Sequence, residues 1–401
     1  MCLNILFLSE LFYPHGGGAE LATYLYAKLL AEARFNVVVV TNRFSGEPEF
    51  SRSEGFVVYR LPLLKRGESV KYSVLLRFDV LVSGFMRKWI RWADVVYVPR
   101  FWFSAIPIVK ACGKLVIVHI HDYTPVCPLA IFYDSTKYEV CQRGTCSMSC
   151  ILSFERRKRN SLMAEWSSLL NFVVWPFLTE LVDYSDAVVC VSEAQRALFT
   201  KRRPKLTDKT YVIFNPLPEV PFMRINGKDF GYFGGPNIIK GFPVLIKALS
   251  LLTKSATIQA TRFNDQLSGK IRSFGNAQII FHERLSQAAL NELHKSISAV
   301  IVPSVWPETW GYVLTEAILR GQIVLASRIG GIPEQVEGCE GAFLFEAGDY
   351  RELARLIDYV SGLNMETLIE LGSKNRESFL KRFRSEKVSN SIIELINRIT
   401  N

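Results

Sequence analysis

The chain has 401 residues, of which 49% are hydrophobic and 21% charged. These values exclude a disordered or fibrous protein, and the length is sufficient for two or three domains. The formal net charge of +10 is uneven: residues 1–225 carry 28 Lys and Arg against 20 Asp and Glu, whereas residues 226–401 carry 20 against 18. A basic first half indicates a negatively charged partner, such as anionic lipid, a phosphorylated substrate or nucleic acid.

Neither a secretory signal nor a membrane-spanning segment is expected. The apolar run at residues 4–8 follows no basic start and precedes no small-residue cleavage site. The longest apolar stretch, residues 169–178, is interrupted by Asn171 and Pro176 and is too short to span a bilayer. We therefore expect a cytoplasmic protein that makes peripheral contact with the inner face of the cell membrane.

Short apolar runs alternate with longer amphipathic segments in the first half of the chain. The runs predict strands at residues 3–8, 37–41, 56–61, 95–98, 115–120, 187–191 and 211–214. Continuous apolar, β-branched runs suit strands that are buried on both faces, and their alternation with helices predicts a parallel sheet.

A proline-rich connector at residues 215–226 interrupts this pattern, which then starts again. Further strands are predicted at residues 230–233, 257–260, 278–281, 299–302, 323–326 and 342–345, and final helices at 350–361, 365–379 and 386–399. The α/β pattern predicts two doubly wound, Rossmann-like lobes, residues 1–220 and 221–401, with a cysteine-containing insertion at about 122–150. The last helix is expected to cross back to the first lobe. Ligands bind at the carboxyl ends of such strands, so the site is expected in a cleft between the lobes.

Two glycine-rich loops are candidate anion sites. Gly16, Gly17 and Gly18 separate the first strand from the first helix, where backbone amides can approach a phosphate closely. Lys240 follows Gly234-Gly235 and opens a helix, although Phe242 stands where a Walker loop has Ser or Thr. A tight turn, or a turn with a solvated lysine, would explain each loop equally well.

The third candidate is the segment 303–317, which ends a strand and begins a helix. Glu308 lies in its loop and Glu316 about two turns into the helix, and the helix start carries Trp310, Gly311 and Tyr312. Amides at this start would bind the negative end of a sugar nucleotide, while the carboxylates would accept hydrogen bonds from sugar and ribose hydroxyls. The alternative without a ligand is that these residues cap the helix and that the glutamate is solvated.

Residues 303–336 resemble the signature of glycosyltransferase family 4, a retaining family with the GT-B fold. The resemblance rests on Glu308, Glu316, the downstream Gly330-Gly331 and Pro333-Glu334, and it extends to residues 13–20, His121 and Lys240. It implies an active hexosyltransferase that uses a nucleotide-diphosphate sugar and needs no metal or other cofactor. By the same resemblance, His121 contacts the transferred sugar, Glu308 the donor sugar, Glu316 the ribose, and Lys240 with the glycine loop the diphosphate.

One position departs from the family pattern. The family usually has arginine directly after the glycine that aligns with Gly234, and this chain has Gly235. That arginine helps to hold the donor diphosphate. Three alternatives follow: Lys240 and the first glycine loop suffice here, another base such as Arg262 or Arg284 takes its place, or donor binding is weakened or altered.

The first lobe is expected to bind the acceptor, a glycan or a lipid-linked molecule of cell-envelope polysaccharide, glycolipid or glycoprotein biosynthesis. Its basic residues Lys71, Arg77, Arg87, Lys88 and Arg91 are interspersed with apolar residues up to Trp92. This pattern is typical of contact with an anionic membrane, and an ordinary helix with a solvated face would explain it equally well. No nucleic acid is expected. Two alternatives are an epimerase or synthase of the same fold, and a basic binding protein without catalysis, which would leave both glutamates unexplained.

Four cysteines fall within the insertion: Cys127, Cys141, Cys146 and Cys150. Four thiolates can hold a structural zinc or an iron–sulfur cluster, but the usual Cys-x-x-Cys knuckle is absent. We expect reduced cysteines without a metal.

Overall fold

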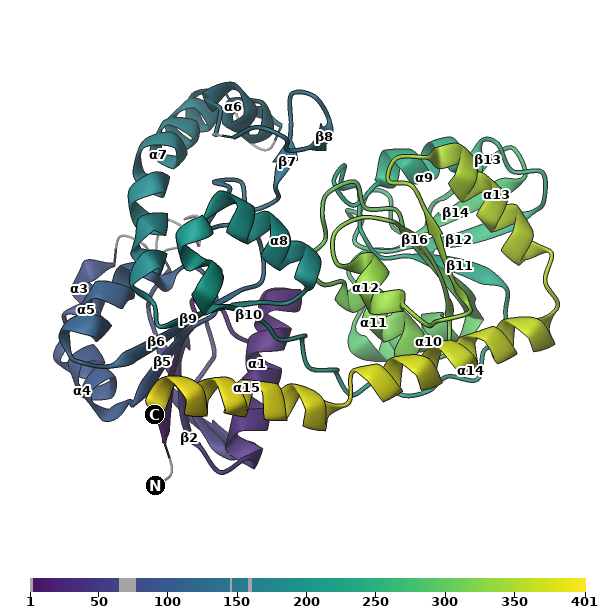
Figure 1. The fold of residues 1–401 in the computed structure, drawn as a ribbon. Helices are drawn as coiled ribbons and strands as arrows, with labels where there is room; N and C mark the ends of the chain where they lie inside the picture. The colour runs from purple at the N-terminus through teal and green to yellow at the C-terminus, as the bar shows by residue number, and fades with distance from the viewer. Residues whose placement is uncertain (1–2, 65–76, 145, 158–160) are drawn as a thin grey trace. The chain divides into compact units, whose positions relative to one another are not determined.

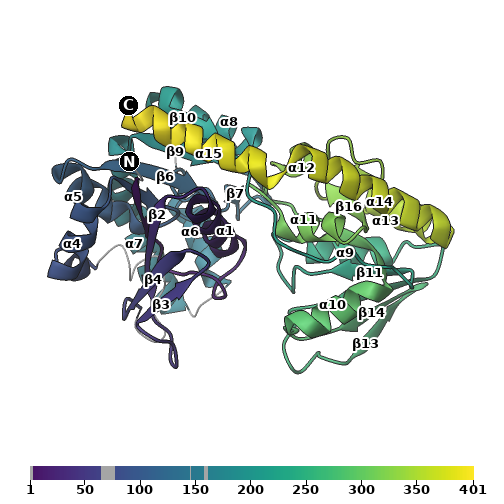
Figure 2. The same ribbon diagram turned by 90° about the horizontal axis from the view of Figure 1, so that it is seen from below.

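The computed structural model describes residues 3–64, 77–144, 146–157 and 161–401. The chain divides into two compact units, each built on its own sheet (Figures 1 and 2). Unit 1 comprises Met1–Leu217 together with Arg384–Asn401, and unit 2 comprises Pro218–Phe383. No helix of the described residues has both the length and the apolar character needed to cross a membrane.

Unit 1 contains a sheet with the strand order β10-β9-β6-β5-β1-β2-β4-β3. Its strands pair in parallel, except for the edge strand β3, which is antiparallel to β4. The strands are β1 (Asn4–Leu8), β2 (Asn36–Asn42), β3 (Phe50–Ser53), β4 (Phe56–Leu61), β5 (Val95–Val98), β6 (Leu115–Ile120), β9 (Ala187–Cys190) and β10 (Thr210–Val212).

Helices cover both faces of this sheet, which explains the uninterrupted apolar runs. In β1, Ile5 and Phe7 join a core with α1 and α15, whereas Leu6 and Leu8 join a second core with α4 and α5. Figure 1 shows α15, in yellow, close to α1, in purple. The helices are α1 (Gly18–Glu32), α3 (Phe78–Leu81), α4 (Gly84–Trp92), α5 (Ile106–Ala111), α6 (Met148–Arg156), α7 (Ser161–Glu180), α8 (Glu193–Arg202) and α15 (Ser385–Thr400).

Unit 2 has the strand order β13-β14-β12-β11-β15-β16-β17, parallel except for the edge strand β13. The strands are β11 (Asp229–Tyr232), β12 (Ala256–Ala260), β13 (Ile271–Phe274), β14 (Ala277–Phe281), β15 (Ile297–Val302), β16 (Ile323–Ser327) and β17 (Ala342–Phe345). The helices are α9 (Phe242–Leu249), α10 (Gln287–Ser296), α11 (Tyr312–Leu319), α12 (Ile332–Val336), α13 (Tyr350–Ser361) and α14 (Met365–Arg382).

Each sheet has a central strand from which the chain order runs in opposite directions. β1 lies between β2 and β5, and β11 lies between β12 and β15. Such a switch point opens a crevice at the carboxyl ends of the strands, where ligands of doubly wound sheets bind. The loops after β1, β5 and β6 in unit 1, and after β11 and β15 in unit 2, are therefore the places to look for a site.

The predicted parallel strands are confirmed. The described residues also contain four strands that the sequence pattern did not predict: the edge strands β3 and β13, and the two-residue strands β7 (Tyr133–Asp134) and β8 (Glu139–Val140), which form a small sheet of their own. The edge strands β3 and β13 are short and largely exposed, so they lack the long apolar run that marked the other strands.

Candidate functional site

Lys240 and Glu308 meet at the switch point of the second sheet. Lys240 ends the loop after β11 and Glu308 lies in the loop after β15; their Nζ and Oε1 atoms are 2.6 Å apart. Ser304 donates a second hydrogen bond to the same carboxylate oxygen, at 2.7 Å. The Glu308 residue is 4% exposed, while the Lys240 side chain is 37% exposed. The Glu308 carboxylate is therefore buried, and the Lys240 ammonium group lies nearer to solvent.

Close backbone packing fixes the two loops that carry this pair. Gly241 has a φ of +79°, and a Cβ there would lie 1.7 Å from the Pro303 carbonyl oxygen, so only glycine fits beside the second loop. Val305 N donates to Ile239 O at 2.9 Å across the same junction. Gly241 therefore allows the backbones of the two loops to approach each other closely.

The start of α11 faces the end of the same loop. Gly311 is its N-cap residue, and the Gly311 N–H donates to Gln335 Oε1 at 2.8 Å. The Trp310 ring packs edge-on against Phe383, with centroids 5.1 Å apart. Because Gly311 N is bonded to Gln335, the helix amides that an anion would meet begin at the following residues. Burial, and then the nearby Glu316, raise the pKa of Tyr312 well above its usual value.

Glu316 lies one turn further along α11 and is held by Arg320. Arg320 Nη1 is 3.1 Å from Glu316 Oε2, and Nη2 donates to Asn291 Oδ1 at 3.3 Å. Arg320 is fully buried, and burial lowers its pKa while Glu316 opposes that shift. The side chain of Glu316 keeps 27% of its surface exposed, so its carboxylate can accept a further hydrogen bond.

Arg262 lies beside the position where the family's arginine is missing. A Cβ on Gly235 would lie 3.1 Å from Arg262 O and 3.4 Å from Arg262 Cβ. Both residues have left-handed backbones, with φ of +63° at Gly235 and +68° at Arg262. Arg262 and Arg284 are both exposed, and of the two it is Arg262 whose backbone adjoins the first glycine-rich turn of unit 2.

A second charged cluster occupies the switch point of the first sheet. Arg100 follows β5, and its guanidinium is 3.7 Å from Glu10, 3.5 Å from Asp122 and in an ion pair with Glu20. Burial alone would lower the pKa of Arg100, but the three carboxylates raise it. Arg100 and Glu10 were not predicted from the sequence, because each is a single charged residue after a strand, without a spacing motif.

Glu10 is an unusual member of this cluster. Its side chain is completely buried, and burial raises its pKa to about 7 although Arg100 opposes the shift. A carboxyl group that titrates near neutral pH, at a strand end that binds ligands in this fold class, can hold or release a proton under physiological conditions.

The predicted anion site at Gly16, Gly17 and Gly18 already faces a carboxylate. Gly17 N donates to Glu20 Oε2 at 2.6 Å, and a Cβ on Gly16 would lie 2.5 Å from the Glu20 side chain. Gly16 has a φ of +94°, which favours glycine. Glu20 and Arg100 therefore form part of this loop's environment, and a phosphate would meet both.

His121 lies at the end of β6, in the same unit as the glycine loop. It is 8% exposed, and its ring stacks on His119 with centroids 4.3 Å apart. Burial, and then the charge of Arg100, lower the pKa of His121 to about 3. The imidazole is therefore neutral near pH 7 and can take part in hydrogen bonds to a sugar without carrying charge.

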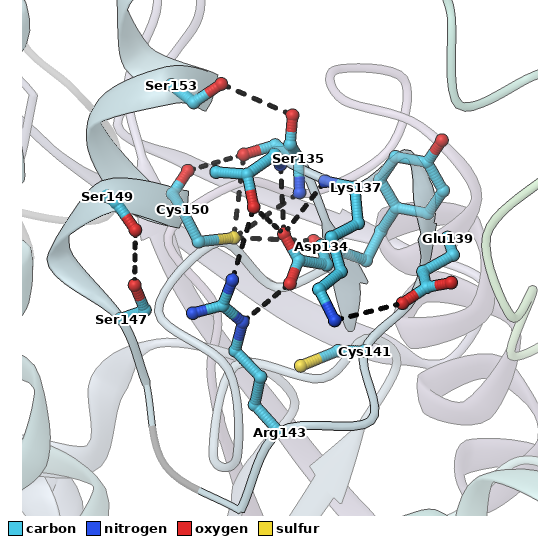
Figure 3. Close-up of polar contacts among 12 residues, drawn as sticks. Asp134, Ser135, Lys137, Glu139, Cys141, Arg143, Ser147, Ser149, Cys150 and Ser153 are labelled. Carbon is cyan, nitrogen blue, oxygen red and sulfur yellow. Dashed lines mark hydrogen bonds and ion pairs between the residues drawn. The ribbon is translucent and has the colours of Figure 1, made fainter.

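The cysteine-containing insertion is organised by Asp134 rather than by its thiols (Figure 3). Asp134 accepts hydrogen bonds from Thr136 and from Arg143 Nε, the latter at 2.6 Å. Burial by itself would raise the pKa of Asp134, but these hydrogen bonds lower it to about 2. Cys150 Sγ accepts from Ser135 N at 3.4 Å. Among the described residues, no three His, Cys, Asp or Glu side chains are grouped so as to hold a metal ion.

The structure describes only part of the basic stretch that was expected to contact a membrane, residues 77–92. Phe85, Trp89 and Trp92 of α4 pack against the core of unit 1, since they line the inner side of the helix, while Arg87, Lys88 and Arg91 are exposed. In α4 the exposed side is therefore charged, and its three aromatic side chains are not available as membrane anchors. Lys71 lies outside the described residues.

Known proteins resemble the chain along most of its length. A family model described as Glycosyltransferase Family 4 matches residues 16–218, and one described as Glycosyl transferases group 1 matches residues 228–378. An uncharacterised 42.6 kDa protein in the cps region of Klebsiella pneumoniae is 22% identical over 338 residues, which cover 83% of this chain and 87% of that protein.

Solved structures show the same architecture. Sucrose-phosphate synthase from Thermosynechococcus elongatus superposes with a TM-score of 0.71 at 14% identity, covering 99% of both chains. HepE from Anabaena, solved in complex with UDP-glucose, has a TM-score of 0.63 at 19% identity, covering 99% of this chain and 100% of that one. The fold is thus GT-B, and the protein belongs to glycosyltransferase family 4.

Proposed function

We propose that this glycosyltransferase moves a hexose, with retention of anomeric configuration, from a nucleotide-diphosphate sugar to a glycan or lipid-linked acceptor. The observation that carries the proposal is the contact of 2.6 Å between Lys240 and Glu308 at the switch point of the second sheet. The structure of HepE with UDP-glucose supports a nucleotide-sugar donor for a chain of this fold.

Without a donor, the charge of Lys240 is balanced by Glu308. In our proposal, Lys240 pairs with the donor diphosphate instead of Glu308 when the donor binds, because two phosphates carry more negative charge than one carboxylate. Glu308 stays bonded to Ser304 and accepts a hydrogen bond from a hydroxyl of the donor sugar. The amides at the start of α11 stabilise the diphosphate, and Glu316 accepts a bond from the ribose.

The chemical step needs few protein groups. The bond between the anomeric carbon and the diphosphate oxygen breaks, and the acceptor oxygen bonds to the same face of that carbon. The acceptor's hydroxyl proton passes to the departing diphosphate. Lys240 and the helix amides stabilise the leaving group electrostatically. Neutral His121 is proposed to position the transferred sugar. The step as written uses no metal ion or other cofactor.

A donor panel tests the proposal. Full-length protein is incubated with UDP-, GDP-, ADP- and dTDP-hexoses, with and without polyprenyl-phosphate-linked saccharide, and release of nucleoside diphosphate is measured. We expect release from one donor class, and product with the anomeric configuration of the donor by NMR. Absence of release from every donor, or an inverted product, would contradict the proposal.

The two central residues are tested by substitution. Lys240→Met should weaken binding of the nucleoside diphosphate about 10- to 100-fold by calorimetry, since charge-assisted hydrogen bonds contribute roughly 1.5–3 kcal/mol. Glu308→Gln should lower turnover more than it lowers affinity for the nucleoside diphosphate, because its proposed partner is the sugar. Lys247→Met, at an exposed position of α9, is the matched control and should change neither. Equal affinity in Lys240→Met and wild type would show that Lys240 does not bind the donor.

A further inference from the structure

Helix α7 has an outward face made of large apolar side chains. Its exposed fractions are 63% for Trp166, 49% for Val173 and 70% for Phe177. At 100° per residue these positions lie on one half of the helix with three leucines. We call this half the α7 stripe; it comprises Leu162, Trp166, Leu169, Leu170, Val173 and Phe177. A helix of 20 residues is about 30 Å long, so the stripe is extended.

The inward face of α7 is small and polar. Ala164, Ser167, Ser168 and Asn171 are all buried, and Ser168 Oγ donates to Ala164 O at 2.6 Å. This face packs against α6 and against the short helical turns around residues 102–105 and 181–184. A helix on the surface of a soluble domain has the opposite pattern, with apolar residues inward. Large exposed apolar patches of this kind mark binding surfaces.

Charge favours lipid over a second copy of the chain as the partner. The net charge is +10, so two copies would repel each other, whereas an anionic membrane attracts the protein. A cation also lies near the amino end of the helix, where Arg156 is 53% exposed and pairs with Glu165 at 3.0 Å, whereas Arg203, beyond the carboxyl end, is 19% exposed and paired with Asp183. An apolar helix face beside basic groups is typical of helices that lie in a membrane interface.

We propose that the α7 stripe docks the protein on an anionic lipid surface, with α7 lying in the plane of the interface. The stripe inserts its tryptophan and aliphatic side chains among the lipids, and the exposed cations of α4 add long-range attraction without insertion. This inference rests on the proposed function only in that a lipid-linked acceptor would be met at such a surface.

Vesicles without donor or acceptor test the surface separately from catalysis. Wild-type protein is mixed with vesicles of phosphatidylcholine containing 30% phosphatidylglycerol and with pure phosphatidylcholine, and bound protein is measured by sedimentation. The variant Trp166→Ser/Leu170→Ser/Phe177→Ser removes the centre of the stripe. The control Leu251→Ser/Ile271→Ser/Ile369→Ser removes three exposed apolar side chains from unit 2.

We expect wild type and control to bind the anionic vesicles, and the α7 variant to bind at least tenfold more weakly while keeping the wild-type nucleoside diphosphate affinity. Tryptophan emission should shift to the blue on binding, and Trp166→Phe should reduce this shift. Equal binding by the α7 variant would overturn the proposal. So would a wild-type dimer that the α7 variant dissociates, because the stripe would then be an interface between copies. Failure of donor turnover would contradict the proposed function and leave vesicle binding as a separate result.

Discussion

The buried Glu10, at the switch point of the first sheet, should make the free energy of unfolding depend on pH. Its pKa is about 7 in the folded protein against an ordinary value of 4.5, mainly because it is buried. Between these two values the folded state binds more protons than the unfolded chain, so the free energy of unfolding falls as pH rises from about 4.5 to about 7. Above pH 7 this contribution is constant.

Replacement by a neutral amide removes the effect. Glu10→Gln should match wild type near pH 4.5 and exceed its free energy of unfolding by roughly 3 kcal/mol at pH 8, since each pKa unit corresponds to about 1.4 kcal/mol. Urea unfolding at several pH values measures this difference. Glu49→Gln, whose glutamate side chain is 77% exposed, is the control and should follow wild type throughout. A gain that does not vary with pH would mean that Glu10 is not protonated on folding.

At the scale of single elements, Gln335 links α12 to α11. It is fully buried, accepts from Gly311 N at 2.8 Å and donates to Thr315 Oγ1 at 3.2 Å. Gln335→Leu leaves these buried groups without their partner, which should cost about 1–3 kcal/mol of stability. Because the start of α11 then loses its fixed position, binding of the nucleoside diphosphate should weaken as well. The exposed Gln278→Leu serves as control in thermal unfolding and calorimetry; identical results for both variants would show that Gln335 does not position α11.

The elements with a strong local signal were predictable. β17 and α13 have the predicted bounds, since a short apolar run and a helix capped by Asp349 leave clear local patterns of apolar and capping residues. The sequence also singled out Lys240 and Glu308, which the structure brings together.

Other features depend on contacts between distant segments. Arg100 meets Glu10 and Asp122 only because β5, β1 and β6 end at one edge of the sheet. The hydrogen bond from Gly311 N to Gln335 Oε1 likewise joins residues that are 24 positions apart. In α7, the residues are apolar enough to suggest a core helix, and only tertiary packing reveals that the polar face is the buried one. A periodicity argument assigns the apolar face inward and therefore fails for a helix with this reversed pattern.

At the scale of the whole molecule, the last helix of the chain belongs to the first unit. α15 begins after the chain has completed unit 2, yet it contributes Val388, Ile392, Leu395 and Ile396 to the core that includes Ile5 and Phe7. Each of these side chains contributes roughly 1.5–3 kcal/mol by its burial. Together they represent a large share of the 5–15 kcal/mol that typically stabilises a domain. Unit 1 therefore depends on the final residues of the chain, whereas the core of unit 2 is built without them.

A single core substitution tests this dependence within the intact chain. Ile392 is fully buried, so Ile392→Ala should cost about 2–5 kcal/mol, and the cost should fall on unit 1 alone. Calorimetry should show one unfolding transition moved to lower temperature, and nucleoside diphosphate, proposed to bind unit 2, should still raise the temperature of the other. Glu394→Ala, an exposed neighbour on the same helix, should leave both transitions in place. If Ile392→Ala instead lowered both transitions equally, the two units would unfold as one cooperative body, and α15 would stabilise the entire molecule rather than the first unit.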